Sequence, residues 1–136
     1  MTQEEYMKQF EDLGVLRRGH YLRTSGRHTN LCVQCARLFE TAQQAEGVCQ
    51  ALAQRFAHSG AQVVMGAAIG GLLPGYEVAR ALGLPYVYCE RRDGAMMLRR
   101  GFAIPKGAKV LIVEDEVTTG ASVREMMEIV DRKSTR

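Results

Sequence analysis

The sequence has no tryptophan, only three prolines and four cysteines, and no long hydrophobic run. Only Cys32 and Cys35 are closely spaced, with no second such pair and no close histidine pair, so reduced structural thiols are favoured over a zinc site. No apolar stretch approaches the roughly 18 residues that a membrane-spanning helix needs. The first ten residues are acidic and polar rather than basic and then apolar, which predicts no signal peptide. We therefore expect a cytoplasmic protein.

The composition is that of an ordinary soluble domain. The 136 residues are 46% hydrophobic and 24% charged, which excludes a disordered, collagen-like or disulfide-dense chain. The net charge, 18 − 15 = +3, does not by itself predict nucleic-acid binding. Arginines gather between Arg91 and Arg100, however, and acids gather at Glu114–Glu116. Two interpretations fit this distribution: two solvated loops, or a site for an anion that carries hydroxyl groups or a metal ion.

The first sixty residues predict a helix, a hairpin and a second helix. Thr2–Glu5 is a capping box, and apolar residues at helical spacing follow as far as Leu13. The stretch 20–36 is β-prone on both sides of the turn signal Ser25–Gly26, which indicates a hairpin. A second capping box at 41–44 begins a helix that the periodicity extends to Gly60.

The rest of the chain predicts an α/β domain. Apolar strands at 62–65, 85–89 and 109–113 alternate with helical segments that end at 82 and 130, and a polar loop is expected over 90–100. Continuous apolar strands of this kind indicate a parallel sheet covered by helices on both faces. Such a sheet usually has more than three core strands, and the last helix passes directly into a polar tail at 131–136. We therefore expect C-terminal strands to be missing.

The most informative segment runs from Val110 to Ser122. An apolar strand delivers Glu114 and Asp115 to the C-terminal edge of the sheet, where open α/β folds bind ligands. The residues 118–122, TTGAS, then lead into a helix N-terminus, whose free N–H groups and dipole favour a phosphate. Those five residues alone are equally typical of a capped helix start. Together with two adjacent acids, whose mutual repulsion a ribose or a cation would relieve, they predict a ribose-5-phosphate site.

This segment resembles the 5-phosphoribosyl-1-diphosphate (PRPP) motif of type I phosphoribosyltransferases, in which an apolar strand, two acids and two variable residues precede TTG-x-S. Three further stretches, at 19–28, 66–71 and 90–102, are similar to the branch of that family that uses orotate. The resemblance extends from about Gly14 to Val130. It implies a single phosphoribosyltransferase domain over 1–136, with an N-terminal helix and hairpin hood at 1–40 and the core at 41–136.

The resemblance also implies roles for individual residues. Glu114 and Asp115 are expected to act in catalysis, and Asp115 is the candidate contact for a metal ion. Thr118 and Arg132 are expected to bind orotate, although Arg132 follows the last helix without the intervening strand of the family. PRPP binding is expected at the acids and the loop (Glu114, Asp115, Glu116, Val117, Thr118, Thr119, Gly120, Ala121, Ser122), at a glycine turn for the diphosphate (Ala68, Ile69, Gly70, Gly71) and at a mobile arginine loop (Arg91, Arg99, Arg100).

The reaction implied by the resemblance transfers phosphoribose from PRPP to orotate, with Mg²⁺ on the oxygens of PRPP and a homodimer as the active assembly. Better-known orotate enzymes carry lysine and histidine in the mobile loop, whereas residues 91–100 contain neither, so arginines would neutralise the leaving diphosphate. Membrane and nucleic-acid partners are not expected. Three alternatives remain open: a type I enzyme for a purine base, a PRPP-binding regulator without turnover, and an inactive fragment.

Overall fold

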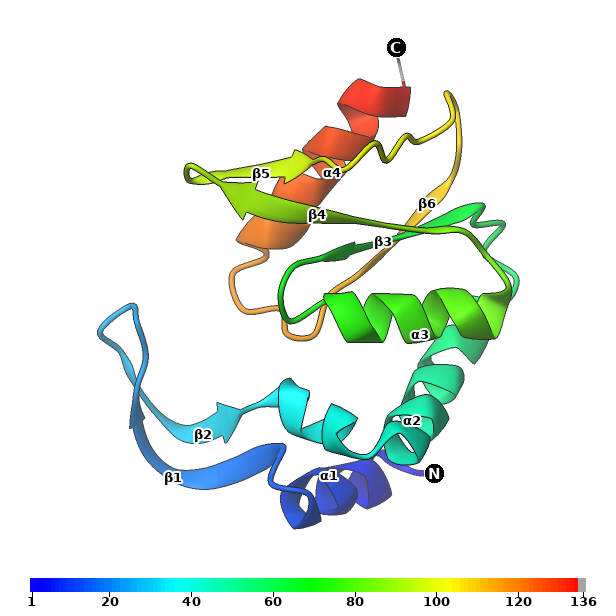
Figure 1. Ribbon diagram of the computed structural model, residues 1–136. Helices are drawn as coiled ribbons and strands as arrows, with labels where there is room; N and C mark the ends of the chain where they lie inside the picture. Colours follow the sequence, from blue (N-terminus) through cyan, green and yellow to red (C-terminus); the bar gives the residue numbers. More distant parts are fainter. Residues whose placement is uncertain (135–136) are drawn as a thin grey trace. The chain divides into compact units, whose positions relative to one another are not determined.

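The computed structural model describes residues 1–134 (Figure 1). The last two residues of the domain predicted over 1–136, Thr135 and Arg136, lie outside the described residues. The chain divides into two compact units, Met1–Gln44 and the part that begins at Ala45. This division falls four residues after the boundary expected between hood and core.

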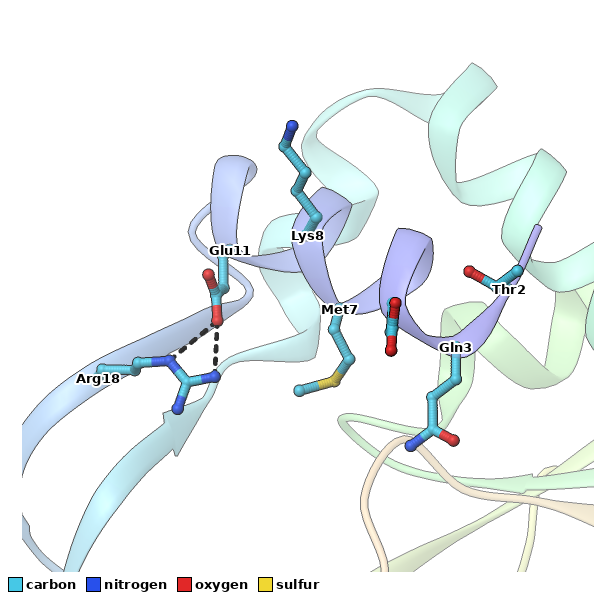
Figure 2. Close-up of a pocket in the computed structure, with 7 residues that line it drawn as sticks. Thr2, Gln3, Met7, Lys8, Glu11 and Arg18 are labelled. Carbon is cyan, nitrogen blue, oxygen red and sulfur yellow. Dashed lines mark hydrogen bonds and ion pairs between the residues drawn. The ribbon is translucent and has the colours of Figure 1, made fainter.

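The first unit contains the predicted helix and hairpin. Helix α1 (Gln3–Asp12) begins with the predicted capping box, in which the Thr2 N–H donates to Glu5 Oε2 at 2.6 Å and the Glu5 N–H donates to Thr2 Oγ1 at 3.2 Å. Strands β1 (Leu16–Leu22) and β2 (His28–Val33) pair in antiparallel fashion. Figure 2 shows how α1 is tied to β1, through an ion pair of 2.9 Å between Glu11 Oε1 and Arg18 Nη2.

A short 3₁₀ helix, η1 (Cys35–Glu40), follows the hairpin and was not predicted. Its one buried residue is Leu38. A single apolar anchor leaves no periodic pattern, so this element has no signal in the sequence. Helix α2 (Ala42–Gln54) comes next and ends earlier than the periodicity predicts.

The second unit is built on a four-stranded sheet in the order β5-β4-β3-β6. Strands β3 (Val63–Ala67), β4 (Tyr86–Arg92) and β6 (Val110–Val113) are parallel, as predicted. Helix α3 (Leu72–Leu82) connects β3 to β4, and helix α4 (Ala121–Ser134) follows β6. Figure 1 shows α3 and α4 on opposite sides of the sheet.

Alternate residues of β3 face the two helices. Val63, Met65 and Ala67 belong to a buried cluster with Met126 and Ile129 of α4. Gly66, one position out of phase, faces the side of α3, where the Tyr86 ring fills the space that a side chain on Gly75 would need. The sheet is therefore buried on both faces, which explains why β3 is apolar throughout.

The polar loop expected over 90–100 is largely a hairpin, and this expectation was wrong. Strand β5 (Ala95–Leu98) pairs with β4 in antiparallel fashion, with Arg92 opposite Ala95. The two turn residues Asp93 and Gly94 have φ angles of 52° and 80°. Positive φ at both positions is what a tight two-residue hairpin requires, and Asp-Gly is a strong sequence signal for it.

Helix α4 also extends beyond the predicted limit of Val130 and takes in the first part of the polar tail. Arg132 and Lys133 lie in its last turn, where cations interact favourably with the helix dipole. Over residues 1–134, no helix combines the length and the hydrophobicity needed to cross a membrane.

Replacement by alanine is expected to have opposite effects on stability at two helical glycines, Gly75 of α3 and Gly47 of α2. A Cβ on Gly75 would lie 2.7 Å from Cε2 of Tyr86, whereas a Cβ on Gly47 of α2 meets nothing within 4 Å. We expect Gly75→Ala to lower the free energy of unfolding by about 1–3 kcal/mol through overpacking. Gly47→Ala should raise it by about 0.5–1 kcal/mol, because alanine favours the helix. Urea denaturation of both variants checks this, and equal effects would contradict it.

Candidate active site

The glycine turn and the acid pair meet because β3 and β6 are neighbours. The two strands run in parallel, with Gly66 opposite Val113, so both end at the same edge of the sheet. Residues 68–71 continue from β3, and Glu114 and Asp115 continue from β6. Segments more than forty residues apart in the sequence are thus brought together where open α/β sheets place their ligands.

The turn lies so close to the acids that a side chain at either glycine would displace a neighbouring group. A Cβ on Gly70 would overlap the carboxylate of Asp115. A Cβ on Gly71 would lie 2.9 Å from Oε1 of Glu114 and 2.8 Å from the backbone oxygen of Ala67. Gly70 and Gly71 thus present bare backbone beside the carboxylates, as a turn that approaches an anion must.

The two acids differ in their surroundings. Glu114 is half-buried and accepts hydrogen bonds from the Ser122 hydroxyl at 3.1 Å and from the Asp115 N–H at 3.2 Å. Burial raises the pKa of Glu114 above its ordinary value of 4.5. Asp115 is exposed, and its Oδ1 accepts from the Glu116 N–H at 2.9 Å. Ser122 therefore links the acid pair to the predicted phosphate loop.

The loop after the acids ends at the N-terminus of α4. Residues 115–119 are exposed, and the Thr119 hydroxyl accepts from the Ala121 N–H at 3.3 Å. Gly120 has a φ of 81°, a conformation that residues with side chains rarely adopt. Exposed hydroxyls and backbone N–H groups at a helix N-terminus are suited to binding an anion.

Comparisons with known proteins identify the family of this chain. A family model described as the phosphoribosyl transferase domain matches residues 36–135. The orotate phosphoribosyltransferase of Pelotomaculum thermopropionicum is 50% identical over 134 residues, which cover 98% of this chain and 70% of that protein. The chain belongs to the orotate phosphoribosyltransferase family.

Solved structures of phosphoribosyltransferases share the fold of this chain. The orotate phosphoribosyltransferase of Aeropyrum pernix superposes with a TM-score of 0.76 at 24% identity, covering 93% of this chain and 73% of that one. The adenine phosphoribosyltransferase of Leishmania tarentolae gives 0.72 at 17% identity, covering 98% and 71%. Because enzymes named for different bases share the fold, the fold alone does not identify the base.

The arginines that the family resemblance assigns to the diphosphate are paired with acids in this structure. Both terminal nitrogens of Arg91 contact the Glu125 carboxylate of α4, at 2.8 and 3.1 Å. Arg99 and Arg100 donate to Glu90 at 2.9 and 3.0 Å. The Arg100 bond and charge hold the pKa of Glu90 below its ordinary value. All three arginines therefore lie on or beside the β4–β5 hairpin, each engaged by a carboxylate.

Arg132 is separated from the other predicted site residues along α4. It lies eleven positions beyond Ala121, which corresponds to about 16 Å of helix. The structure therefore joins the glycine turn, the acids and the loop, and it places Arg132 at the far end of the helix that begins there.

Tyr86 was not among the predicted site residues, yet its side chain supports the backbone at the end of the glycine turn. Its hydroxyl donates to the backbone oxygen of Leu72 at 2.8 Å, directly after the turn. A Cβ on Gly66 would lie 2.5 Å from this hydroxyl. Burial raises the pKa of Tyr86, so the hydroxyl stays protonated and remains a donor. The available signal was Gly66 alone, because a glycine inside a strand can mark a close approach of another group.

Within residues 1–134, no group of three or more histidine, cysteine and acidic side chains is arranged to hold a metal ion. Cys32, Cys35, Cys49 and Cys89 form no disulfide bond in the structure. Burial raises the pKa of both Cys49 and Cys89 to about 11, so these two thiols are inert at neutral pH.

The raised pKa of Glu114 predicts a pH-dependent effect on stability. A carboxyl whose folded pKa exceeds its unfolded value stabilises the fold below the unfolded pKa, and this contribution is lost as the pH rises through the folded pKa. We expect Glu114→Gln to raise the melting temperature at pH 7, with a gain that shrinks below pH 4.5. Glu128→Gln on the exposed side of α4 serves as the control. A lower melting temperature for Glu114→Gln at pH 7 would contradict the prediction.

Proposed function

We propose that this chain transfers the phosphoribosyl group of PRPP to orotate, giving orotidine 5′-monophosphate and diphosphate. Membership of the orotate phosphoribosyltransferase family supports this activity. The observation that carries the site is the contact of the Gly70–Gly71 turn with Glu114 and Asp115, beside the N-terminus of α4. A diphosphate site, a ribose site and a phosphate site would then lie in one continuous row.

Each part of the row has a role in this proposal. The carboxylates of Glu114 and Asp115 accept from the two ribose hydroxyls, and residues 118–122 donate to the 5′-phosphate. The backbone of Gly70 and Gly71 faces the diphosphate. No side chain attacks the sugar, because the orotate nitrogen displaces diphosphate at the anomeric carbon. The protein therefore acts by positioning the substrates and by stabilising developing charge.

The arginines would neutralise the leaving diphosphate after exchanging partners. Arg91, Arg99 and Arg100 are bound to carboxylates, but these pairs are at least partly exposed. Exposed ion pairs contribute only about 0.2–1 kcal/mol each. A polyanion competes readily with such a pair, so the arginines can move from Glu90 and Glu125 to a bound diphosphate.

The donor set beside the turn fits Mg²⁺. This ion prefers oxygen ligands and is usually held by one or two carboxylates together with substrate phosphates, and Asp115 offers an exposed carboxylate. When bound, Mg²⁺ neutralises charge on the diphosphate and on the ribose oxygens. We further propose a homodimer and a cytoplasmic location, both in keeping with the family resemblance. Light scattering of the purified protein tests the dimer.

The base is tested by product formation. Wild-type protein with Mg-PRPP should consume orotate and leave adenine and hypoxanthine unchanged, as followed by absorbance and chromatography. Consumption of a purine in place of orotate would identify that purine as the substrate base. Binding of PRPP without turnover of any base would identify a regulator or an inactive fragment and would contradict the proposed activity.

The PRPP site is tested separately from turnover. The double variant Glu114→Gln, Asp115→Asn preserves shape and removes charge, so we expect PRPP affinity to fall at least about 10-fold, or roughly 1.4 kcal/mol, while the fold persists. Glu128→Gln should bind PRPP normally in the same titration. In the wild type, PRPP should slow amide exchange at 118–122. Unchanged affinity in the double variant and unchanged exchange would refute the assignment.

A further inference from the structure

We propose that His20 and His28 form a binding site for a first-row transition-metal ion, Ni²⁺, Cu²⁺ or Zn²⁺, on the β1–β2 hairpin. Both side chains are exposed and neither takes part in the proposed transfer reaction. The site lies within the first unit of the chain, so this proposal does not rest on the proposed function.

The two imidazoles meet through their ring nitrogens. Nδ1 of His28 lies 2.8 Å from Nε2 of His20. The ring centroids are 4.7 Å apart and the ring planes are inclined by 32°. Because the nitrogens approach each other more closely than the ring centres do, the rings face each other edge to edge and are not stacked.

A bulge in β1 brings the two histidines to the same face of the hairpin. Arg18 lies opposite Leu31, but Tyr21 lies opposite Thr29, so the register shifts by one residue in between. After the shift, His28 pairs with Leu22, and His20 lies two positions from Leu22 on the same face of β1. Without the shift, His20 would fall opposite Thr29, and His28 would point to the other face. The bulge therefore creates the pair.

The separation of the nitrogens suits a shared cation. Nitrogen ligands lie about 2.0–2.1 Å from a metal such as zinc, so two of them on one ion are about 3 Å apart. In the neutral pair, one nitrogen at the contact carries a proton and donates it to the other. On metal binding that proton moves to the second nitrogen of its own ring, and the two exposed rings rotate so that both lone pairs point to one ion. Both imidazoles stay neutral, and water completes the coordination.

The surroundings determine which cations are bound. Imidazole suits nickel, copper and zinc, whereas Mg²⁺ prefers oxygen and should not bind here. Within residues 1–134, no third histidine, cysteine or acid joins the pair to form a larger group. Arg23 and Arg27 of the adjoining turn are cationic, and they weaken binding by charge alone. Coordination by the two nitrogens therefore has to supply the affinity.

Isothermal titration with Ni²⁺ in a non-chelating buffer tests the pair. We expect His20→Asn and His28→Asn each to weaken Ni²⁺ binding at least about 10-fold. His58→Asn removes the third histidine of the chain, outside the hairpin, and should bind as the wild type does. Mg²⁺ should give no heat attributable to this site. Equal Ni²⁺ affinity in the wild type and in both hairpin variants would overturn the proposal.

The thiols of Cys32 and Cys35 are the competing ligands in the same unit. The double variant Cys32→Ser, Cys35→Ser should keep full Ni²⁺ affinity, and loss of binding there would assign the metal to the thiols instead. A second measurement needs no variant. In NMR spectra of the wild type, paramagnetic Ni²⁺ should broaden the signals of His20 and His28 first. Broadening centred elsewhere would overturn the proposal even if a histidine variant failed to fold.

Discussion

The parallel pairing of β3 with β6 is the constraint on which the rest of the site depends. Register places Gly66 beside Val113, and the chain segments that leave the two strands then have to share the same space. Glycine at positions 70 and 71 meets this requirement, because a Cβ on Gly71 would run into the Ala67 backbone and one on Gly70 would displace the Asp115 carboxylate. The glycine turn and the acid pair are thus one structural unit, although the sequence separates them.

The same requirement explains the packing underneath. Tyr86 enters β4 on the face that carries Gly66, and its ring occupies the space that Gly75 leaves free. Its hydroxyl satisfies the Leu72 carbonyl at the start of α3. A hydrogen bond of this kind contributes about 1 kcal/mol. The turn is thus supported by the Tyr86 hydroxyl and lies against the carboxylates of Glu114 and Asp115.

Arg91, Arg99 and Arg100 of the second unit are each paired with a carboxylate. Glu90 forms ion pairs with Arg99 and Arg100, and Glu125 forms an ion pair with Arg91. These pairs hold the arginines against the β4–β5 hairpin and α4. Glu114, in contrast, is held by a hydroxyl and an N–H, and its burial disfavours the charged form. The uncompensated carboxylate therefore stands at the edge of the sheet, where a ligand that donates hydrogen bonds would stabilise it.

Local patterns in the sequence determined the capping box, the first hairpin, the positions of the apolar strands and the order of acids and phosphate loop, because each depends on neighbours within a few residues. The dipeptide Asp93-Gly94 is likewise a local signal, and it predicts the turn between β4 and β5. Only the tertiary structure decided that residues 70 and 71 touch Glu114 and Asp115, that Tyr86 supports them, and that Arg91 turns to Glu125. It also decided that His20 and His28 meet, because Gly19 in β1 suggests a bulge but does not fix the one-residue shift in register that brings them to one face. Contacts of this kind depend on strand order and register, which are settled by the packing of the whole sheet and not by any local segment.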